Sequence, residues 1–246
     1  MRVILSRKGF DETAGGKANP IMPDGTLLSL PIPSNSSRHY SELRYGDETY
    51  ENIIKQLGGK YGAGTCHIDP DIRKGVYDVP AEWKPIFGQC DAALTHLKNQ
   101  NVGQHDLFLF YGWFKQTERK EGRLRYILNA PNLHIVYGYL QVGKMVTDKE
   151  EITEYHWHPH AHMSIDNNCL FIARDTLSWN SNLDGYGVFS YDKRLVLTRD
   201  EAKNRSEWGE LPELLKKYNL TMTKQRQEHV IQEHPAVEAW AKSLIG

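Results

Sequence analysis

Cysteine is scarce in this sequence of 246 residues, and the three cysteines, Cys66, Cys90 and Cys169, are far apart with no Cys-x-x-Cys pair. This spacing argues against a disulfide framework and against a cysteine zinc site. Long hydrophobic runs are also missing: no stretch approaches the ~18 apolar residues of a membrane span, and Arg7 and Lys8 interrupt the first apolar segment. We therefore expect no signal peptide, no membrane partner and a cytoplasmic protein.

The sequence also lacks an excess of positive charge. Its 30 lysine and arginine residues are balanced by 31 aspartate and glutamate residues, which gives a net charge of −1 at pH 7. A domain that binds nucleic acid through a broad cationic surface usually carries a clear positive excess. Any contact with nucleic acid must therefore be local, or the substrate must be a nucleotide or an extruded base.

No internal repeat, low-complexity tract or long linker divides the chain. With 39% hydrophobic and 25% charged residues, the composition is that of an ordinary globular protein that is large enough to bury a core. We expect residues 1–246 to form a single domain.

The apolar pattern changes along the chain from helical periods to compact apolar runs and back. The compact runs predict strands at residues 2–5, 106–114, 133–146, 170–173, 187–191 and 195–198. The helical periods predict helices at residues 50–57, 88–100 and 211–218, and a last helix that ends near 240–244. Between them, residues 11–40 predict an ordered loop and residues 115–123 a charged hairpin excursion. The expected fold is α+β, with a central, mostly antiparallel, barrel-like sheet and flanking helices.

Two cations and a carboxylate follow the first predicted strand. Arg7 and Lys8 lie beside glycines, and a guanidinium fork or a lysine point charge next to flexible backbone is suited to phosphate. The segment is no Walker-type loop, because Asp11 stands where that motif needs a glycine and Ala18 where it needs a hydroxyl. We predict that Arg7 and Lys8 hold a substrate phosphate; a surface turn with solvated charges is the alternative.

Three titratable residues alternate between positions 67 and 71. In an extended backbone, His67, Asp69 and Asp71 project to one face. Two carboxylates next to an imidazole can act as a general base, stabilise a cationic transition state or bind a metal. We predict that they line one cleft with the N-terminal cations and Asp11. The alternative is a surface Asp-Pro-Asp turn that caps a helix.

Histidines gather in one segment, where four of the 11 histidines occupy alternate positions: His156, His158, His160 and His162. An extended backbone would place all four on one face, within metal-ligand distance of one another. We predict that His158 and His160 bind a divalent metal; a solvent-facing histidine-rich loop is the alternative.

One further pattern combines these two segments. His67-x-Asp69 followed by a later histidine has the order of a two-histidine, one-carboxylate iron centre. Such a centre would suit the oxidative modification of a base, and we keep this interpretation as an alternative.

The predicted helix at 88–100 has a polar face that carries Gln89, His96, Asn99 and Gln100. Amides paired with an imidazole can read the edge of a base through hydrogen bonds. We predict that these four side chains contact the substrate; the alternative is that they satisfy the ends of the helix.

Taken together, short motifs resemble the third nucleotide-modification-associated domain family, small proteins linked to phage and bacterial DNA modification. The motifs are Ser6-Arg7-Lys8-Gly9-Phe10-Asp11 with Gly15-Gly16, Ile21 with Pro23-Asp24-Gly25-Thr26, His67 with Asp69-Pro70-Asp71, Gly88-Gln89 with His96-Leu97 and Asn99-Gln100, residues 106–114, Tyr139-Leu140-Gln141-Val142-Gly143, His158-Pro159-His160, Arg205-Ser206 with Trp208 and Leu211-Pro212, and Arg226-Gln227-Glu228. Two positions depart from the family pattern: Gln225 replaces an expected glycine and His229 an expected aromatic residue.

The resemblance implies an enzyme that acts on nucleotides or DNA bases, modifying them or removing modified bases. Scattered polar motifs make more sense converging in one pocket than as separate folding signals. Motifs and resemblance together predict catalytic roles for Asp69, Asp71, His67, Asp11 and Glu228, and substrate contacts from Arg7, Lys8, Gln89, His96, Asn99, Gln100, Trp113 and Arg226. The expected partner is a nucleotide or DNA base, and the expected cofactor is a divalent metal.

A binding module without chemistry is the other interpretation. The segments 106–114 and 135–146 resemble the core strands of PUA-like barrels, which hold modified bases in an aromatic pocket. In that case Trp113, Tyr137 and Tyr139 would form the walls of the pocket.

Overall fold

The computed structural model describes residues 1–60 and 64–246. Its strands are β1 (Val3–Arg7), β2 (Asn19–Ile21), β3 (Ile32–Pro33), β4 (Arg44–Tyr45), β5 (Glu48–Thr49), β6 (Cys66–His67), β7 (Ile86–Cys90), β8 (Leu107–Lys120), β9 (Arg123–Tyr126), β10 (Leu133–Val146), β11 (Asn168–Ala173), β12 (Thr176–Leu177), β13 (Asn180–Asp184), β14 (Tyr186–Val188), β15 (Met222–Gln225) and β16 (Glu228–Ile231). The α-helices are α1 (Tyr50–Gln56), α2 (Asp91–Asn99), α3 (Lys149–Glu154), α4 (Glu210–Lys217) and α5 (Pro235–Ile245), and the 3-10 helices are η1 (Tyr40–Glu42), η2 (Pro159–His162) and η3 (Lys193–Leu195). No helix in the described ranges is long and apolar enough to span a bilayer.

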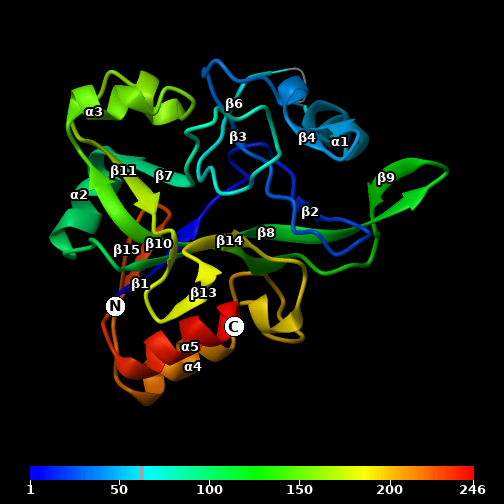
Figure 1. The fold of residues 1–246 in the computed structure, drawn as a ribbon. Coiled ribbons are helices and arrows are strands. Elements are labelled where there is room, and N and C mark those ends of the chain that lie inside the picture. Colours follow the sequence, from blue (N-terminus) through cyan, green and yellow to red (C-terminus); the bar gives the residue numbers. More distant parts are fainter. Residues whose placement is uncertain (61–63) are drawn as a thin grey trace.

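A mixed sheet of ten strands organises the chain (Figure 1). Its main path runs β15-β16-β1-β8-β10-β11-β7, and the strands β2, β9 and β14 attach to β8 and β10. Neighbouring strands are antiparallel, except that β8 runs parallel to both β1 and β2. The predicted α+β class and mostly antiparallel sheet are therefore confirmed.

The sheet curls into a half-barrel, and aromatic side chains fill its interior. The ring of Phe87 on β7 lies 4.8 Å from Phe108 and 5.3 Å from Phe110 on β8, measured between ring centroids. These strands are separated by β10 and β11 in the sheet order, so only a curled sheet can bring them into contact. The edge-to-face geometry of the rings is the favoured one for aromatic pairs. The barrel-like expectation is confirmed in this partial form.

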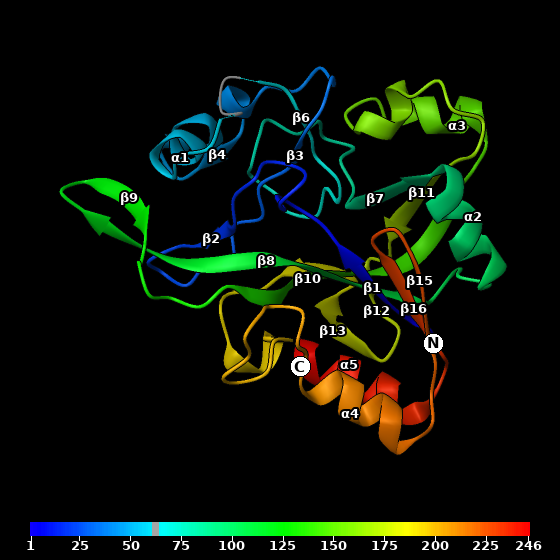
Figure 2. The ribbon, with the colours of Figure 1, turned by 180° about the vertical axis from the view of Figure 1, so that it is seen from behind.

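The remaining elements lie on two sides of the sheet. In Figure 1, α1, α3 and the short strands β3 and β6 lie above it, and α4 and α5 lie below it. The view from behind shows the same separation (Figure 2). Helix α2 packs against β7 and β11 near one end of the sheet and against β15 and β16 at the other, so it bridges the opening of the half-barrel.

The two longest strands form the centre of the sheet. The segments 106–114 and 133–146 are strands, as predicted, and they pair as antiparallel neighbours β8 and β10. Strand β8 continues to Lys120 and turns back as β9, so the expected hairpin excursion over 115–123 is also confirmed.

Several predicted elements differ from the structure. The helix expected at 88–100 begins only at Asp91, because Ile86–Cys90 pair with β11 as a strand. The strand expected at 195–198 does not form: Leu195 ends η3, and Val196 and Thr198 make only isolated bridges, to Ile135 and to Trp208. The segment 187–191 forms a strand only as far as Val188, and the long loop 11–40 contains the short strands β2 and β3.

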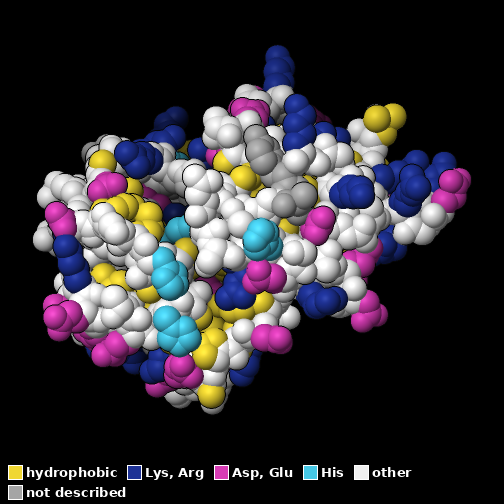
Figure 3. All heavy atoms as spheres, turned by 90° about the horizontal axis from the view of Figure 1, so that it is seen from above, with side chains coloured by type: hydrophobic (Ala, Val, Ile, Leu, Met, Phe, Trp, Pro, Cys, Tyr) yellow, Lys and Arg dark blue, Asp and Glu magenta, His cyan; other side chains and the backbone are white. Residues whose placement is uncertain are grey.

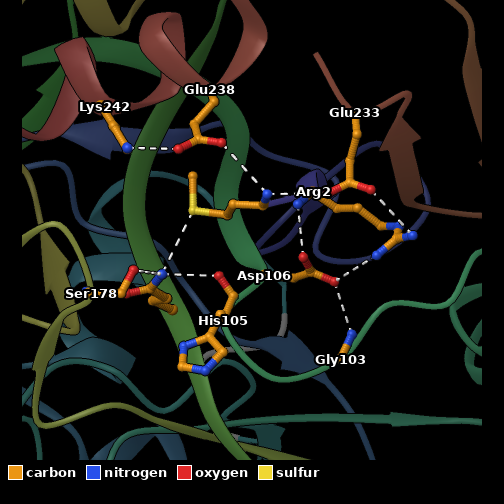
Figure 4. Close-up of polar contacts among 10 residues, drawn as sticks. Arg2, Gly103, His105, Asp106, Ser178, Glu233, Glu238 and Lys242 are labelled. Atoms are coloured by element: carbon orange, nitrogen blue, oxygen red, sulfur yellow. Dashed lines mark hydrogen bonds and ion pairs between the residues drawn. The ribbon is translucent and has the colours of Figure 1, made fainter. Parts of the chain in front are cut away.

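A polar network fixes the start of β1 (Figure 4). The Asp106 carboxylate accepts the backbone N–H of Arg2 at 2.7 Å and that of Gly103 at 2.9 Å. The terminal amine of Met1 contacts Glu233 at 3.1 Å, just before α5. These contacts anchor β1 beside β8 and set the register that decides which residues of β1 face each side of the sheet.

Candidate functional site

The side chains of Arg7 and Lys8 lie on opposite faces of the sheet. Arg7 pairs with Tyr111 across β1 and β8, and the two side chains share one face of the sheet. Lys8 follows directly and its side chain lies on the other face, against the ring of Phe87 at 4.5 Å. The expectation that Arg7 and Lys8 line one cleft is therefore wrong, because neighbouring residues of an extended strand project to opposite sides.

The ammonium group of Lys8 lies between two buried carboxylates. Its Nζ is 3.2 Å from Oε1 of Glu228 and 3.9 Å from Oδ2 of Asp69. Glu228 comes from β16, and its Oε1 also accepts a hydrogen bond of 2.8 Å from the side-chain amide of Gln89 on β7. The other oxygen, Oε2, is buried without a hydrogen-bond partner among the described residues. A buried acceptor without a donor is costly, so this oxygen is available to a ligand N–H.

Asp69 is held as an ionised acceptor. Its Oδ1 accepts the backbone N–H of Gly88 at 2.7 Å and lies 3.5 Å from Nε2 of His158. Burial opposes the ionisation of Asp69, but the nearby ring of His158 and the charge of Lys8 hold the pKa of this carboxyl well below its usual range. Its Oδ2 accepts no hydrogen bond among the described residues and points toward Lys8.

His67, Asp69 and His160 form a compact group of potential metal ligands. One donor atom from each of the three side chains lies within 4.8 Å of the other two. Ligand atoms around one ion at ~2.1 Å lie roughly 3–4 Å apart, so a small rotation of the rings would close them on a metal. Burial lowers the pKa of His67 to about 4 and also lowers the pKa of His160, so both rings are neutral and have a lone pair to donate.

A second layer of contacts orients His160. Its Nδ1 lies 2.7 Å from Oδ1 of Asn168, and the Asn168 amide nitrogen donates to the backbone carbonyl of His160 at 2.9 Å. Because the carbonyl oxygen of Asn168 can only accept, the proton of His160 is on Nδ1 and Nε2 carries the lone pair. Metal-binding histidines are commonly fixed in this way. A Cβ at Gly88 would approach the ring of His160 to 2.3 Å, so a glycine is needed beside it.

The other histidines of the cluster are placed differently from the expectation. The segment turns into η2 instead of extending, so the four side chains do not share a face. His158 is buried and its Nδ1 accepts the backbone N–H of His160, which leaves the Nε2 proton directed at Asp69. His158 therefore lies beside Asp69 and outside the group of three potential ligands, and its role as a metal ligand stays a prediction. His156 and His162 lie at the surface.

Asp71 has contacts of its own, although the sequence suggests a common face with Asp69. Strand β6 ends at His67, and Asp71 instead bridges to Ile86, so the segment is not one continuous strand. Its carboxylate accepts hydrogen bonds from the hydroxyl of Tyr77 and from the indole N–H of Trp83, the latter at 2.8 Å. Burial raises the pKa of Asp71 above its usual value.

Lys8, Glu228 and the three potential metal ligands border a cavity of about 370 Å³, here called the front cavity. Its lining includes Lys8, His67, Asp69, Gln89, Cys90, His160, Met163, Arg226 and Glu228. A neighbouring hollow of about 520 Å³ shares His67 and Met163 with it and extends toward Trp157. Seen from above, histidine side chains reach the surface of the molecule, next to lysine, arginine and acidic side chains (Figure 3).

The remaining predicted site residues lie outside the front cavity. Arg7 contacts Asp11 at 3.4 Å, and Asp11 also accepts the backbone N–H groups of Thr13 and Ala14, so it shapes the loop. The indole N–H of Trp113 donates to Asn132. Three residues of α2 and its C-terminal end are also outside the cavity lining: His96, Asn99 and Gln100. Because α2 begins only at Asp91, these three residues lie on parts of the helix that do not border the front cavity.

Two residues of the site had no sequence signal that could reveal them. Asn168 lies in a polar Asp-Asn-Asn run and acts only through His160, to which no spacing rule connects it. Asn19 is fully buried; its Oδ1 accepts the backbone N–H of Leu30 at 2.7 Å, and its amide donates to the carbonyl of Trp113 at 2.9 Å. Asn19 thereby ties the loop of residues 9–30 to β8 beside the cavity.

The aromatic pocket of the binding-module interpretation is not assembled from the three expected rings. Arg205 covers the ring of Trp113 at 4.4 Å, and Tyr139 stacks on Phe189 with centroids 5.4 Å apart. Tyr137 borders a small cavity of about 50 Å³.

A sequence profile of the family described as nucleotide modification associated domain 3 matches residues 2–243. The chain belongs to this family. The match covers nearly the whole chain, and it includes every residue that lines the front cavity. No curated protein and no solved structure showed a significant match, so the PUA-like identity of the fold stays a prediction. The family description connects the chain with nucleotide modification, and the partner is accordingly a nucleotide-related substrate.

Proposed function

We propose that this member of nucleotide modification associated domain 3 is a metal-dependent enzyme that acts on nucleotides or DNA bases in the front cavity. The observation that carries the proposal is the convergence of His67, Asp69 and His160 within 4.8 Å, with both histidines neutral. Two imidazoles and a carboxylate suit iron or zinc, and three protein ligands leave positions open for a substrate or water. Such a metal supplies Lewis-acid or oxidative chemistry when bound.

The cavity also contains groups that suit a polar, anionic substrate. Oε2 of Glu228 is a buried acceptor that fits an exocyclic N–H of a base. Both ends of the Gln89 amide are occupied, by Glu228 and by the backbone N–H of Cys90, so we assign to Gln89 the role of orienting Glu228. Arg226 lies in the turn between β15 and β16 on the cavity lining, with no carboxylate within 4.0 Å among the described residues, and can pair with a phosphate.

Asp69→Asn tests this proposal against Asp71→Asn. The purified protein, loaded with Fe²⁺ or Zn²⁺, is incubated with nucleotides and with DNA, and mass spectrometry of the nucleosides detects any change in mass. We expect the Asp69→Asn activity to fall by ~10²-fold or more, because a ligand and acid–base group is lost. The Asp71→Asn variant should keep most of its activity, since Asp71 lies outside the front cavity.

The same experiment distinguishes an enzyme from a binding module. Undiminished activity in Asp69→Asn would remove the carboxylate from the mechanism. If the metal-loaded wild type binds a modified base but changes no nucleotide substrate, the enzyme proposal fails and the binding module is the better account.

A further inference from the structure

A second pocket, here called the rear pocket, lies on the opposite side of the strands that build the front cavity. It measures about 340 Å³, and its lining includes Arg7, Tyr111, His134, Trp208, Lys224 and His229. Strand pairing explains the placement: Glu228 and Lys8 face the front cavity, so their neighbours His229 and Arg7 face the rear. The front and rear sites therefore meet at β16 and at the end of β1, but they share no side chain.

The charge of the rear pocket is positive. No carboxylate belongs to its lining among the described residues. Arg7 is partly balanced by Asp11 at 3.4 Å, whereas no carboxylate lies within 4.0 Å of Lys224 in the part of the chain that the structure describes. Arg205 lies close by, over the ring of Trp113 and paired with Glu12.

Two buried histidines in the rear pocket have ring nitrogens without partners. The indole N–H of Trp208 donates to Nδ1 of His134 at 3.0 Å, so the proton of His134 is on Nε2. That Nε2 and both ring nitrogens of His229 are buried and make no hydrogen bond among the described residues. His134 is 4% exposed and His229 is 6% exposed, so leaving these polar atoms unsatisfied is costly.

The walls of the pocket combine these donors with aromatic surface. Tyr111 and Trp208 meet edge to face, with ring centroids 5.2 Å apart. Trp208 and its neighbour Ser206 belong to the motifs noted in the sequence, and the proposed enzyme function uses neither of them. A ligand that matches this pocket carries anionic oxygens for the donors and an apolar part for the rings.

We propose that the rear pocket is a second binding site, for a phosphate-bearing ligand held by Arg7, Lys224 and the N–H groups of its histidines. A phosphate monoester offers several charged oxygens, which the separate cations and imidazole donors can satisfy together. Inorganic phosphate and a nucleoside monophosphate share this chemistry. The aromatic wall would favour the nucleotide. The proposal goes beyond the enzyme function and does not depend on a metal in the front cavity.

Calorimetric titration with inorganic phosphate and with deoxynucleoside monophosphates tests the proposal on the full chain. We expect Arg7→Gln and Lys224→Gln each to weaken binding at least about tenfold, with unchanged circular dichroism. Lys193→Gln, at a side chain that is 78% exposed and outside the pocket, is the matched control and should bind like the wild type. Asp69→Asn should also retain this binding, because Asp69 belongs to the front cavity.

Two results would overturn the proposal. One is a wild type that binds neither probe at millimolar concentration. The other is binding that survives both Arg7→Gln and Lys224→Gln but is lost in Asp69→Asn, which would assign the phosphate to the front cavity. Tighter binding of the nucleotide than of inorganic phosphate, lost in Arg7→Gln and in Lys224→Gln, would support the proposal and identify the nucleotide as the ligand.

Discussion

The front cavity and the rear pocket are built by the same strands, yet their chemistry is opposite. The front cavity gathers acceptors: the carboxylates of Asp69 and Glu228 and the lone pairs of neutral histidines. The rear pocket gathers donors, from Arg7, from Lys224 and from buried imidazoles. Two cations also line the front cavity, Lys8 and Arg226, and the ammonium of Lys8 lies between the carboxylates of Asp69 and Glu228.

This difference shows that adjacent residues of one sequence motif need not belong to the same site. Arg7-Lys8 and Glu228-His229 are each a pair of adjacent residues, and each pair is divided between the two faces of the sheet. The alternation of an extended strand makes this division unavoidable. A cation pair that suggests one phosphate site in the sequence thus contributes one member to a carboxylate cluster and the other to a donor-lined pocket.

The largest expected effect is the independent loss of each ligand: a variant in one site should lose the ligand of that site and keep the ligand of the other. His160→Ala should weaken Zn²⁺ or Mn²⁺ binding by at least about 100-fold, because it removes a ligand, whereas loss of a supporting contact alone typically costs 10–100-fold. Phosphate binding by the same variant should be unchanged. Arg7→Gln should show the reverse pattern, and calorimetry of both variants with both probes checks it. Variants that lose both ligands together would show that the two sites are not independent.

A smaller effect is expected from crowding His160. Gly88→Ala places a Cβ 2.3 Å from the ring, which should displace it and weaken metal binding roughly 10–100-fold, with a loss of ~1–3 kcal/mol in stability. Gly103→Ala is the matched control, since its nearest neighbour would be Met145 Sδ at 4.0 Å. Urea unfolding and metal titration of both variants measure these changes. Equal metal affinity in the two variants would mean that the position of the His160 ring does not matter.

The smallest expected effect is a pH dependence of stability from the rear pocket. Burial, with Lys224 and Arg7 nearby, lowers the pKa of His229 to about 4, and His96 adds to this shift. The unfolded chain binds this proton near pH 6.5, so it holds more protons than the native state between pH 6.5 and about 4. Stability should therefore fall as the pH is lowered through this window.

The variant His229→Gln isolates that contribution. Its urea midpoint, followed from pH 7 to pH 4, should decrease less steeply than that of the wild type, because a titrating group has been removed. His134 titrates in the same direction, since burial lowers its pKa to about 3, so a residual slope is expected. Identical slopes in the wild type and in His229→Gln would contradict a neutral, buried His229.

More of the fold than of the candidate site could be predicted from the sequence. The compact apolar runs at 106–114 and 133–146 predict the central antiparallel pair because burial leaves a strong local pattern, and β8 and β10 confirm it. The start of α2 was not predictable from helical spacing, because pairing of Ile86–Cys90 with β11 overrides it. That pairing is a tertiary effect without a local signal.

The candidate site shows the same limit. His67-x-Asp69 and a later histidine are recognisable in the sequence, and the structure brings His67, Asp69 and His160 together. The presence of His160 in this group, and not of His158, depends on η2 and on the hydrogen bond to Asn168, which no spacing encodes. The contacts of Asp71 likewise depend on tertiary structure, through its bridge to Ile86 and its hydrogen bonds from Tyr77 and Trp83.

An anomalous difference map from crystals soaked with Zn²⁺ tests the central claim most directly. The account predicts a single strong peak in the front cavity, at ~2.0–2.2 Å from one atom each of His67, Asp69 and His160. It also predicts that this peak disappears in crystals of His160→Ala grown under the same conditions. A map without a peak between these three side chains, or a peak that persists in His160→Ala, would contradict the proposed metal centre.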